Sequence, residues 1–138
     1  MSTLKTNTIQ HLTSGFNNIV THTDGAGTVN AAHARAWVCF NASSGTPSIN
    51  ANFNISSITD NGAGDYTLNF TNAMSDANYV FTSSGEQGNQ INVCDIPTGN
   101  VATYKTASSL RFNYAGATTS ATRAVNADPT YCGIAFFR

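Results

Sequence analysis

Charged side chains are scarce in this chain of 138 residues. Asp, Glu, Lys and Arg make up 9% of it, and the formal net charge is −1, whereas about a quarter of an ordinary soluble protein is charged. Six basic residues spread over the whole length cannot form the positive stripe that binds nucleic acid or an anionic membrane. No apolar run approaches the roughly 18 residues of a membrane-spanning helix. We therefore expect no nucleic-acid partner and no membrane insertion.

The residues that usually cover helix surfaces are also few. Glu occurs once, Lys twice and Leu four times, so long amphipathic helices are not expected. In their place stand 17 Asn, 13 Ser and 19 Thr, while apolar residues still make up 41% of the chain. Asn and Ser favour turns, and Thr favours half-solvated strands. The composition predicts a β domain with a core and a polar but uncharged surface.

Cysteine is limited to Cys39, Cys94 and Cys132, an odd number with wide spacing. No Cys-x-x-Cys or Cys-x-x-His pair is present, so a zinc site is not expected. We interpret the three cysteines as buried thiols that behave as small hydrophobes. The sequence leaves open whether any two of them form a disulfide.

Catalytic and metal-binding patterns are missing as well. Residues 35–138 contain no His and no Gly-x-Ser-x-Gly motif, and most carboxylates stand in expected turns. Asp60, Asn61 and Asp65 share one glycine-containing loop, but this loop lacks the alternating ligands and final Glu of an EF-hand, so a hairpin connection is favoured over a calcium site. We predict no catalytic residue, no metal and no cofactor.

Three histidines, His11, His22 and His33, recur at intervals of eleven residues. In a homotrimer, three copies of one His at the threefold axis could hold a metal ion. The favoured interpretation is that they are exposed polar residues of an N-terminal arm. The eleven-residue spacing does not indicate a helical repeat, because Gly15 and Gly25 interrupt it.

Residues 1–34 hold too few large apolar groups to bury a core of their own. We predict an extended arm with one short strand, ordered mainly by contact with another surface and used for attachment or trimer assembly. The candidate anchoring residues are Leu4, Ile9, Leu12, Phe16, Ile19 and Val20.

From residue 35 onward, apolar and polar residues alternate. Residues 36–41 predict a strand that is apolar on both faces, and 49–58 and 66–71 predict the two half-buried arms of a hairpin. Further strands are expected near 78–83, 91–96, 101–106, 109–114 and 131–137. About seven or eight short strands with turn-rich connections predict an antiparallel β-sandwich or barrel-like domain over residues 35–138.

Binding, if present, is expected in polar connections near residues 83–90 and 115–120, because loops on a rigid sheet carry function. The candidate contact residues for a partner or receptor are Gly85, Glu86, Gln87, Asn89, Gly116, Thr118 and Thr119. Four aromatic residues could stack on sugars, although core packing is the favoured interpretation: Trp37, Tyr79, Tyr104 and Tyr114.

One part of the chain is specific enough to suggest a family. A module of tail fibres and small virion proteins of tailed bacteriophages resembles three segments of the chain. They are Ala36-Trp37-Val38-Cys39-Phe40-Asn41, Ala51-Asn52-Phe53-Asn54-Ile55-Ser56-Ser57-Ile58-Thr59-Asp60-Asn61-Gly62-Ala63-Gly64-Asp65-Tyr66-Thr67-Leu68-Asn69-Phe70-Thr71-Asn72-Ala73-Met74 and Asp76-Ala77-Asn78-Tyr79. The start, Ser2 to Gln10, is also similar to such proteins. Cys39 replaces the usual Asn of the module, and Ser43-Ser44-Gly45 lengthens a turn.

The resemblance implies a virion structural protein without catalytic residues, usually a homotrimer. Our leading hypothesis is a short homotrimeric tail fibre or receptor-binding protein that contacts other virion proteins through its arm. The alternatives are a decoration or cement protein on the outer capsid surface and a lectin-like module for a host cell-surface glycan. In the first two cases the protein is located in the virion.

Overall fold

The computed structural model describes residues 20–24, 27–31, 34–86, 91–97, 101–117 and 125–138. The chain divides into two compact units, residues 1–33 and 34–138. In the first unit, β1 (Val20–Asp24) pairs antiparallel with β2 (Gly27–Ala31), and Asp24 faces Gly27 across the ladder. The expectation of one short strand in the arm is therefore wrong, because two strands pair there.

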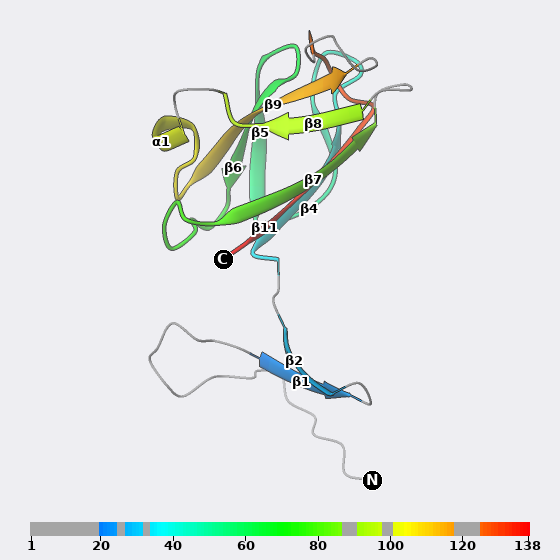
Figure 1. The fold of residues 1–138 in the computed structure, drawn as a ribbon. Helices are drawn as coiled ribbons and strands as arrows, with labels where there is room; N and C mark the ends of the chain where they lie inside the picture. Colours follow the sequence, from blue (N-terminus) through cyan, green and yellow to red (C-terminus); the bar gives the residue numbers. More distant parts are fainter. Residues whose placement is uncertain (1–19, 25–26, 32–33, 87–90, 98–100, 118–124) are drawn as a thin grey trace. The chain divides into compact units, whose positions relative to one another are not determined.

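The second unit is an antiparallel β-sandwich, which confirms the predicted fold class (Figure 1). One sheet, here the β3 sheet, has the order β4-β3-β11-β7. The other, the β9 sheet, has the order β10-β9-β6-β5, with β8 also paired to β9. The elements of this unit are β3 (Ala36–Asn41), β4 (Ser48–Phe53), β5 (Ile55–Gly62), β6 (Asp65–Phe70), β7 (Val80–Glu86), β8 (Ile91–Asp95), α1 (Val101–Tyr104), β9 (Ser109–Ala117), β10 (Val125–Asn126) and β11 (Tyr131–Phe137).

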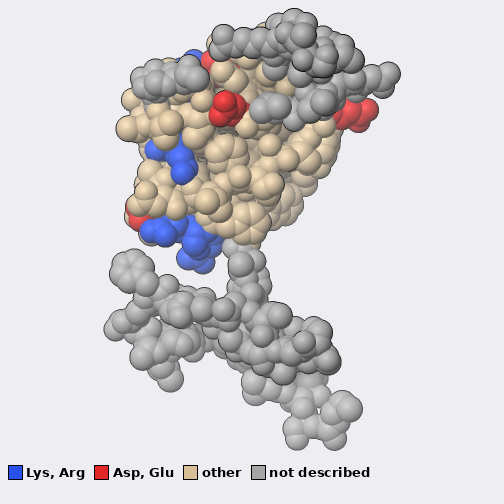
Figure 2. Space-filling view, in the orientation of Figure 1, with Lys and Arg blue, Asp and Glu red and all other residues tan. Residues whose placement is uncertain are grey.

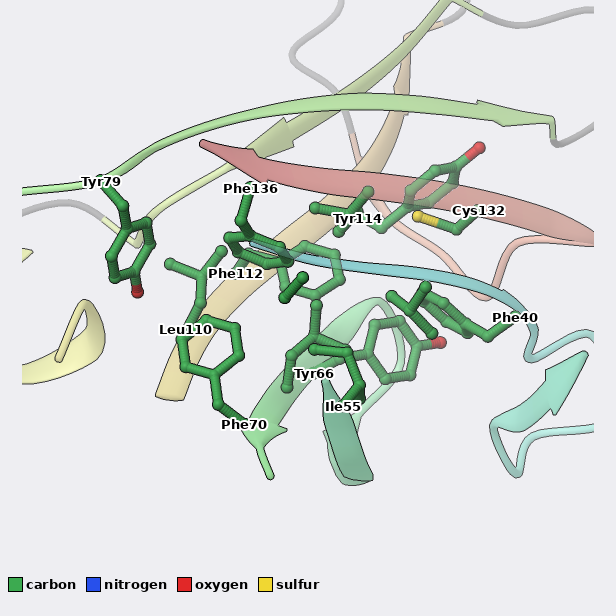
Figure 3. Packing of buried hydrophobic residues seen from close by; sticks show 14 of the residues in the cluster. Phe40, Ile55, Tyr66, Phe70, Tyr79, Leu110, Phe112, Tyr114, Cys132 and Phe136 are labelled. Carbon is green, nitrogen blue, oxygen red and sulfur yellow. The ribbon is translucent and has the colours of Figure 1, made fainter. Parts of the chain in front are cut away.

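Alternating side chains from both sheets form the core between them (Figure 3). Every second residue of β3, β6, β9 and β11 points inward, as expected for strands with period 2. Aromatic rings meet edge to face: Phe40 and Tyr66 lie 5.3 Å apart between ring centroids, and Phe70 and Phe136 lie 5.0 Å apart. Edge-to-face pairs of this kind stabilise a core beyond the area that they bury.

The predicted strand over residues 49–58 is wrong as a single element. Asn54 has a φ of 57°, so the chain turns there and passes from β4 in one sheet to β5 in the other. Asn tolerates this left-handed conformation because its short side chain can hydrogen-bond locally. The hairpin partner of β6 is therefore β5, and β4 pairs with β3.

The hairpin connection expected around Asp60 and Asp65 is confirmed, with a shorter turn than predicted. β5 continues to Gly62, which pairs with Asp65, and Gly62 and Gly64 have positive φ values of 129° and 64°. The carboxylate of Asp60 accepts a hydrogen bond from the Gly62 amide at 2.9 Å. Glycine suits these positions because side chains other than Asn and Asp are strained there.

The strand expected over residues 101–106 is also wrong. Val101–Tyr104 form the single helical turn α1, and the amide of Lys105 donates to the carbonyl of Val101 at 2.9 Å. Val101 is 55% exposed, so its apolar side chain does not belong to the core pattern that the sequence suggested. Within the described ranges, no helix has the length and apolar character needed to cross a membrane.

Candidate functional site

The outer face of the β9 sheet is polar, and its side chains bond to one another. The amide of Asn69 donates to Ser57 Oγ at 3.0 Å and to Thr59 Oγ1 at 3.1 Å. The guanidinium of Arg111 contacts both carboxylate oxygens of Asp65, at 2.9 and 2.7 Å. Because these groups already have partners within the sheet, they have less need of a further surface to satisfy them.

The outer face of the β3 sheet is different, and we call it the outer aromatic face. It comprises the outward residues Phe53 and Ala51 of β4, Trp37 and Cys39 of β3, Tyr131, Gly133, Ala135 and Phe137 of β11, and Val80, Thr82, Ser84 and Glu86 of β7. Four large hydrophobic side chains of this face stay exposed, with exposed fractions of 37% for Trp37, 54% for Phe53, 66% for Val80 and 40% for Tyr131.

Strand register brings two of these side chains, Trp37 and Phe53, together. Trp37 lies opposite Phe53 across β3 and β4, and opposite Ala135 across β3 and β11. Residues that are directly opposite in an antiparallel ladder share a face, with their Cβ atoms about 5 Å apart. Trp37 and Phe53 therefore form an aromatic ridge along one side of the sheet.

A shallow, open groove of about 380 Å³ runs beside this ridge. Its lining includes Trp37, Cys39, Thr82, Ser84, Gly133 and Ala135. The floor is low because β11 presents only Gly133 and Ala135 there. A Cβ atom on Gly133 would lie 2.8 Å from the phenol oxygen of Tyr131 and 3.0 Å from Ser84 Oγ.

Charge is nearly absent from the outer aromatic face, where Glu86 is the one ionisable carboxylate. Figure 2 shows how sparse charge is on the side of this unit that it presents, with a broad surface between a few basic and acidic groups. Water is displaced from an uncharged face at little electrostatic cost. The composition of the face, aromatic and poor in charge, is that of the buried centre of a protein interface.

Three of the predicted contact residues, Gly85, Glu86 and Gly116, lie in strands and not in loops. Gly85 lies within β7 opposite Cys132, and a Cβ atom there would lie 2.4 Å from the ring of Tyr114. Glu86 ends β7 opposite Tyr131, and Gly116 pairs within β9 with Asn92 and Val125. Gln87, Asn89, Thr118 and Thr119 lie outside the described residues.

The anchoring residues proposed for the arm have a similar outcome. Val20 is the first residue of β1 and pairs with Ala31. The others, Leu4, Ile9, Leu12, Phe16 and Ile19, lie outside the described residues.

Of the four aromatics considered for sugar stacking, two belong to the core. Tyr79 and Tyr114 are fully buried, and the phenol of Tyr79 donates to the carbonyl of Ser109 at 3.1 Å. The ring of Tyr104 lies under the guanidinium of Arg111, 4.8 Å from its centroid. Trp37 is the one of the four on the outer aromatic face, where sequence reasoning missed Phe53, Val80 and Tyr131.

No cluster of three potential metal ligands occurs among the residues that the structure describes. The oxygen-bearing residues of the β5–β6 turn have partners within the β9 sheet, because Asp65 is paired with Arg111 of β9 and Asn61 donates to Thr67 Oγ1 at 3.0 Å. His22 pairs with Val29 in the first unit, while His11 and His33 lie outside the described ranges.

All three cysteines are free thiols, and they occupy two environments. Cys132 is buried as predicted, whereas Cys39 and Cys94 are only partly buried. Cys39 lies on the outer aromatic face, with its sulfur 3.8 Å from the phenol oxygen of Tyr131.

Comparison of the chain with protein-family models, with curated proteins and with solved structures found no match.

Proposed function

We propose that this chain is a structural protein of a tailed-bacteriophage virion, a short homotrimeric tail fibre or receptor-binding protein held to the particle through residues 1–34. The observation that carries the proposal is the outer aromatic face, taken with the phage-module resemblance of β3, β5 and β6. Contiguous exposed apolar surface of this kind marks interaction sites in soluble proteins.

A second copy of the same chain is the partner that the face fits best. It carries both a ridge, formed by Trp37 and Phe53, and a groove floored by Gly133 and Ala135. In a threefold ring, each copy presents different parts of its surface to its two neighbours. The ridge of one copy can then enter the groove of the next, and no charged pair has to be desolvated.

Sedimentation and light scattering of the purified chain test this assembly. We expect a trimeric mass for the natural chain and for Val101→Asp, and a monomeric mass for Phe53→Asp. Val101 is a matched control, because its side chain is 55% exposed, against 54% for Phe53, and lies on α1. A monomeric natural chain at high concentration, or equal effects of the two substitutions, would contradict the proposal.

Location in the particle is a separate test. Antibody labelling of intact particles is expected at the tail tip, with a few to a few dozen copies per particle. Label over the whole capsid and hundreds of copies would instead support the decoration protein. Absence from purified particles would exclude both structural roles.

The groove favours a second candidate function, which competes with trimer packing for the same surface. It combines the indole of Trp37 with the hydroxyl groups of Thr82 and Ser84 and has no charged lining residue. An aromatic plane with nearby hydroxyls fits a neutral saccharide of a host surface. A glycan array tests this function: binding should be lost in Trp37→Ala and retained in Val101→Ala, and an array without binders would contradict it.

A further inference from the structure

Two of the three cysteines meet where the sheets of the sandwich come together. Cys94 belongs to β8 of the β9 sheet, and Cys132 belongs to β11 of the β3 sheet. Their sulfur atoms lie 4.0 Å apart. The two residues are 38 positions apart in the chain, so the fold and not local sequence brings them together.

The surroundings of the two thiols differ in a way that suits stepwise chemistry. Cys132 is completely buried, while Cys94 is partly exposed. Figure 3 shows Cys132 among the core residues beside Tyr114. A reagent from solution therefore reaches Cys94 first, and Cys132 is placed behind it.

Hydrogen bonding reinforces this order. The hydrogen bond from the Cys132 thiol holds the pKa of Cys94 below its ordinary value, whereas the same contact and burial raise the pKa of Cys132. The thiolate is the nucleophile in thiol–disulfide exchange.

We propose that Cys94 and Cys132 form an oxidisable dithiol that closes to a disulfide and fastens the two sheets together. The oxidant is a small-molecule disulfide such as oxidised glutathione. This inference does not depend on the proposed function.

The chemistry balances in two exchanges. The Cys94 thiolate attacks one sulfur of the small disulfide, which forms a mixed disulfide and releases one small thiol. The Cys132 sulfur, giving up its proton, then attacks Cys94 Sγ and releases the second small thiol. The two cysteines lose two electrons and two protons in total, and the two released thiols carry them. The sulfur atoms must approach from 4.0 Å to about 2.05 Å, the length of a disulfide bond.

Cys39 serves as an internal control. It lies on the opposite side of the β3 sheet, on the outer aromatic face, and pairs with Gly133. Its sulfur lies 3.8 Å from the phenol oxygen of Tyr131 and on the other face of the sheet from Cys132, so it is not expected to join the bridge.

The test incubates the full chain in glutathione buffers of increasing oxidised fraction. We expect titratable thiols in denaturant to fall from three to one and a peptide map to join residues 94 and 132. The oxidised chain should melt roughly 10 °C higher, because the cross-link restricts the unfolded chain. Reductant should reverse each change.

Three single variants separate this proposal from general oxidation. Cys39→Ser should form the bridge as the natural chain does. Cys132→Ser should stop at the mixed disulfide of Cys94 with glutathione, and folded Cys94→Ser should leave Cys132 unmodified. Three thiols that persist in strongly oxidising buffer would overturn the proposal, as would a bridge to Cys39 or a bridge between two chains.

Discussion

The side-chain oxygen of Asn54 accepts hydrogen bonds from the backbone amide of Asn72 at 2.8 Å and from its side-chain amide at 3.1 Å. In return, Asn54 Nδ2 donates to the Asn72 carbonyl at 3.0 Å and to the Arg35 carbonyl at 3.1 Å. One residue with positive φ thus holds the start of β3, the β4–β5 corner and the end of β6 together. The passage between the two sheets depends on it.

Substitution of this corner residue should be costly. Asn54→Ala loses the four hydrogen bonds and also strains the left-handed backbone, so we expect a loss of about 2–4 kcal/mol in the free energy of unfolding. Asn54→Gly should lose less, because glycine adopts this backbone freely. Urea unfolding measures both, with Asn52→Ala, an exposed residue of β4, as the control. Equal losses for Ala and Gly would show that strain contributes nothing.

A second polar contact ties the β5–β6 hairpin to the chain before β11. Asp128 Oδ1 accepts the Tyr66 hydroxyl at 2.5 Å and the Gly64 amide at 2.9 Å. Asp128→Ala should cost about 2–3 kcal/mol, because it leaves a buried phenol without an acceptor. Tyr66→Phe should cost about 1 kcal/mol, since Asp128 still accepts the hydrogen bond from the Gly64 amide. Thermal and urea unfolding of the two variants measure both losses of stability. A larger loss for Tyr66→Phe than for Asp128→Ala would contradict this account.

Gly64 and Gly45 offer a comparison of strain with steric exclusion. Both have positive φ, but a Cβ atom on Gly64 would lie 2.4 Å from the backbone atoms of Tyr114 and Ala127, whereas nothing lies within 4 Å at Gly45. We expect Gly64→Ala to cost about 3 kcal/mol or more and Gly45→Ala about 1–2 kcal/mol. Equilibrium unfolding of the two variants gives the difference directly. Similar losses would mean that the backbone around Gly64 can move.

Alkaline pH should destabilise the fold through its buried phenols. Burial raises the pKa of Tyr66 and of Tyr114 and raises that of Tyr79 to about 12. The unfolded chain therefore releases these protons first, near the ordinary tyrosine value of about 10, so stability is full below that pH and falls above it. Unfolding curves between neutral pH and strong alkali should show this decline, and it should be shallower in Tyr79→Phe. A flat profile above pH about 10 would contradict the prediction.

Much of the fold could be predicted from the sequence because one signal is local. The alternation in β3, β6, β9 and β11 marks the inward residues, since each strand places successive side chains on opposite faces. Turn chemistry around Asp60 and Gly62 likewise identified the β5–β6 hairpin. The scarcity of the charged helix formers Glu and Lys predicts that long helices are absent.

The sequence reveals only part of the candidate site. The sequence shows a strand at 36–41 that is apolar on both faces, and this was the signal for the outer aromatic face. The alternation through residues 49–58 predicts that Phe53 faces the core with Ile55, and no local pattern reveals that Asn54 turns the chain into the other sheet. Tyr131 reaches the same face through the pairing of β11 with β3, and Val80 reaches it through the pairing of β7 with β11.

By itself, then, the sequence determined an antiparallel β domain with a surface of little charge and a separate N-terminal segment, because composition and period-2 alternation act residue by residue. Only the tertiary structure decided which apolar side chains remain exposed, where the chain changes sheets, and that Cys94 meets Cys132. Those outcomes depend on strand order and register, which join residues far apart in the chain and so leave no local trace in it.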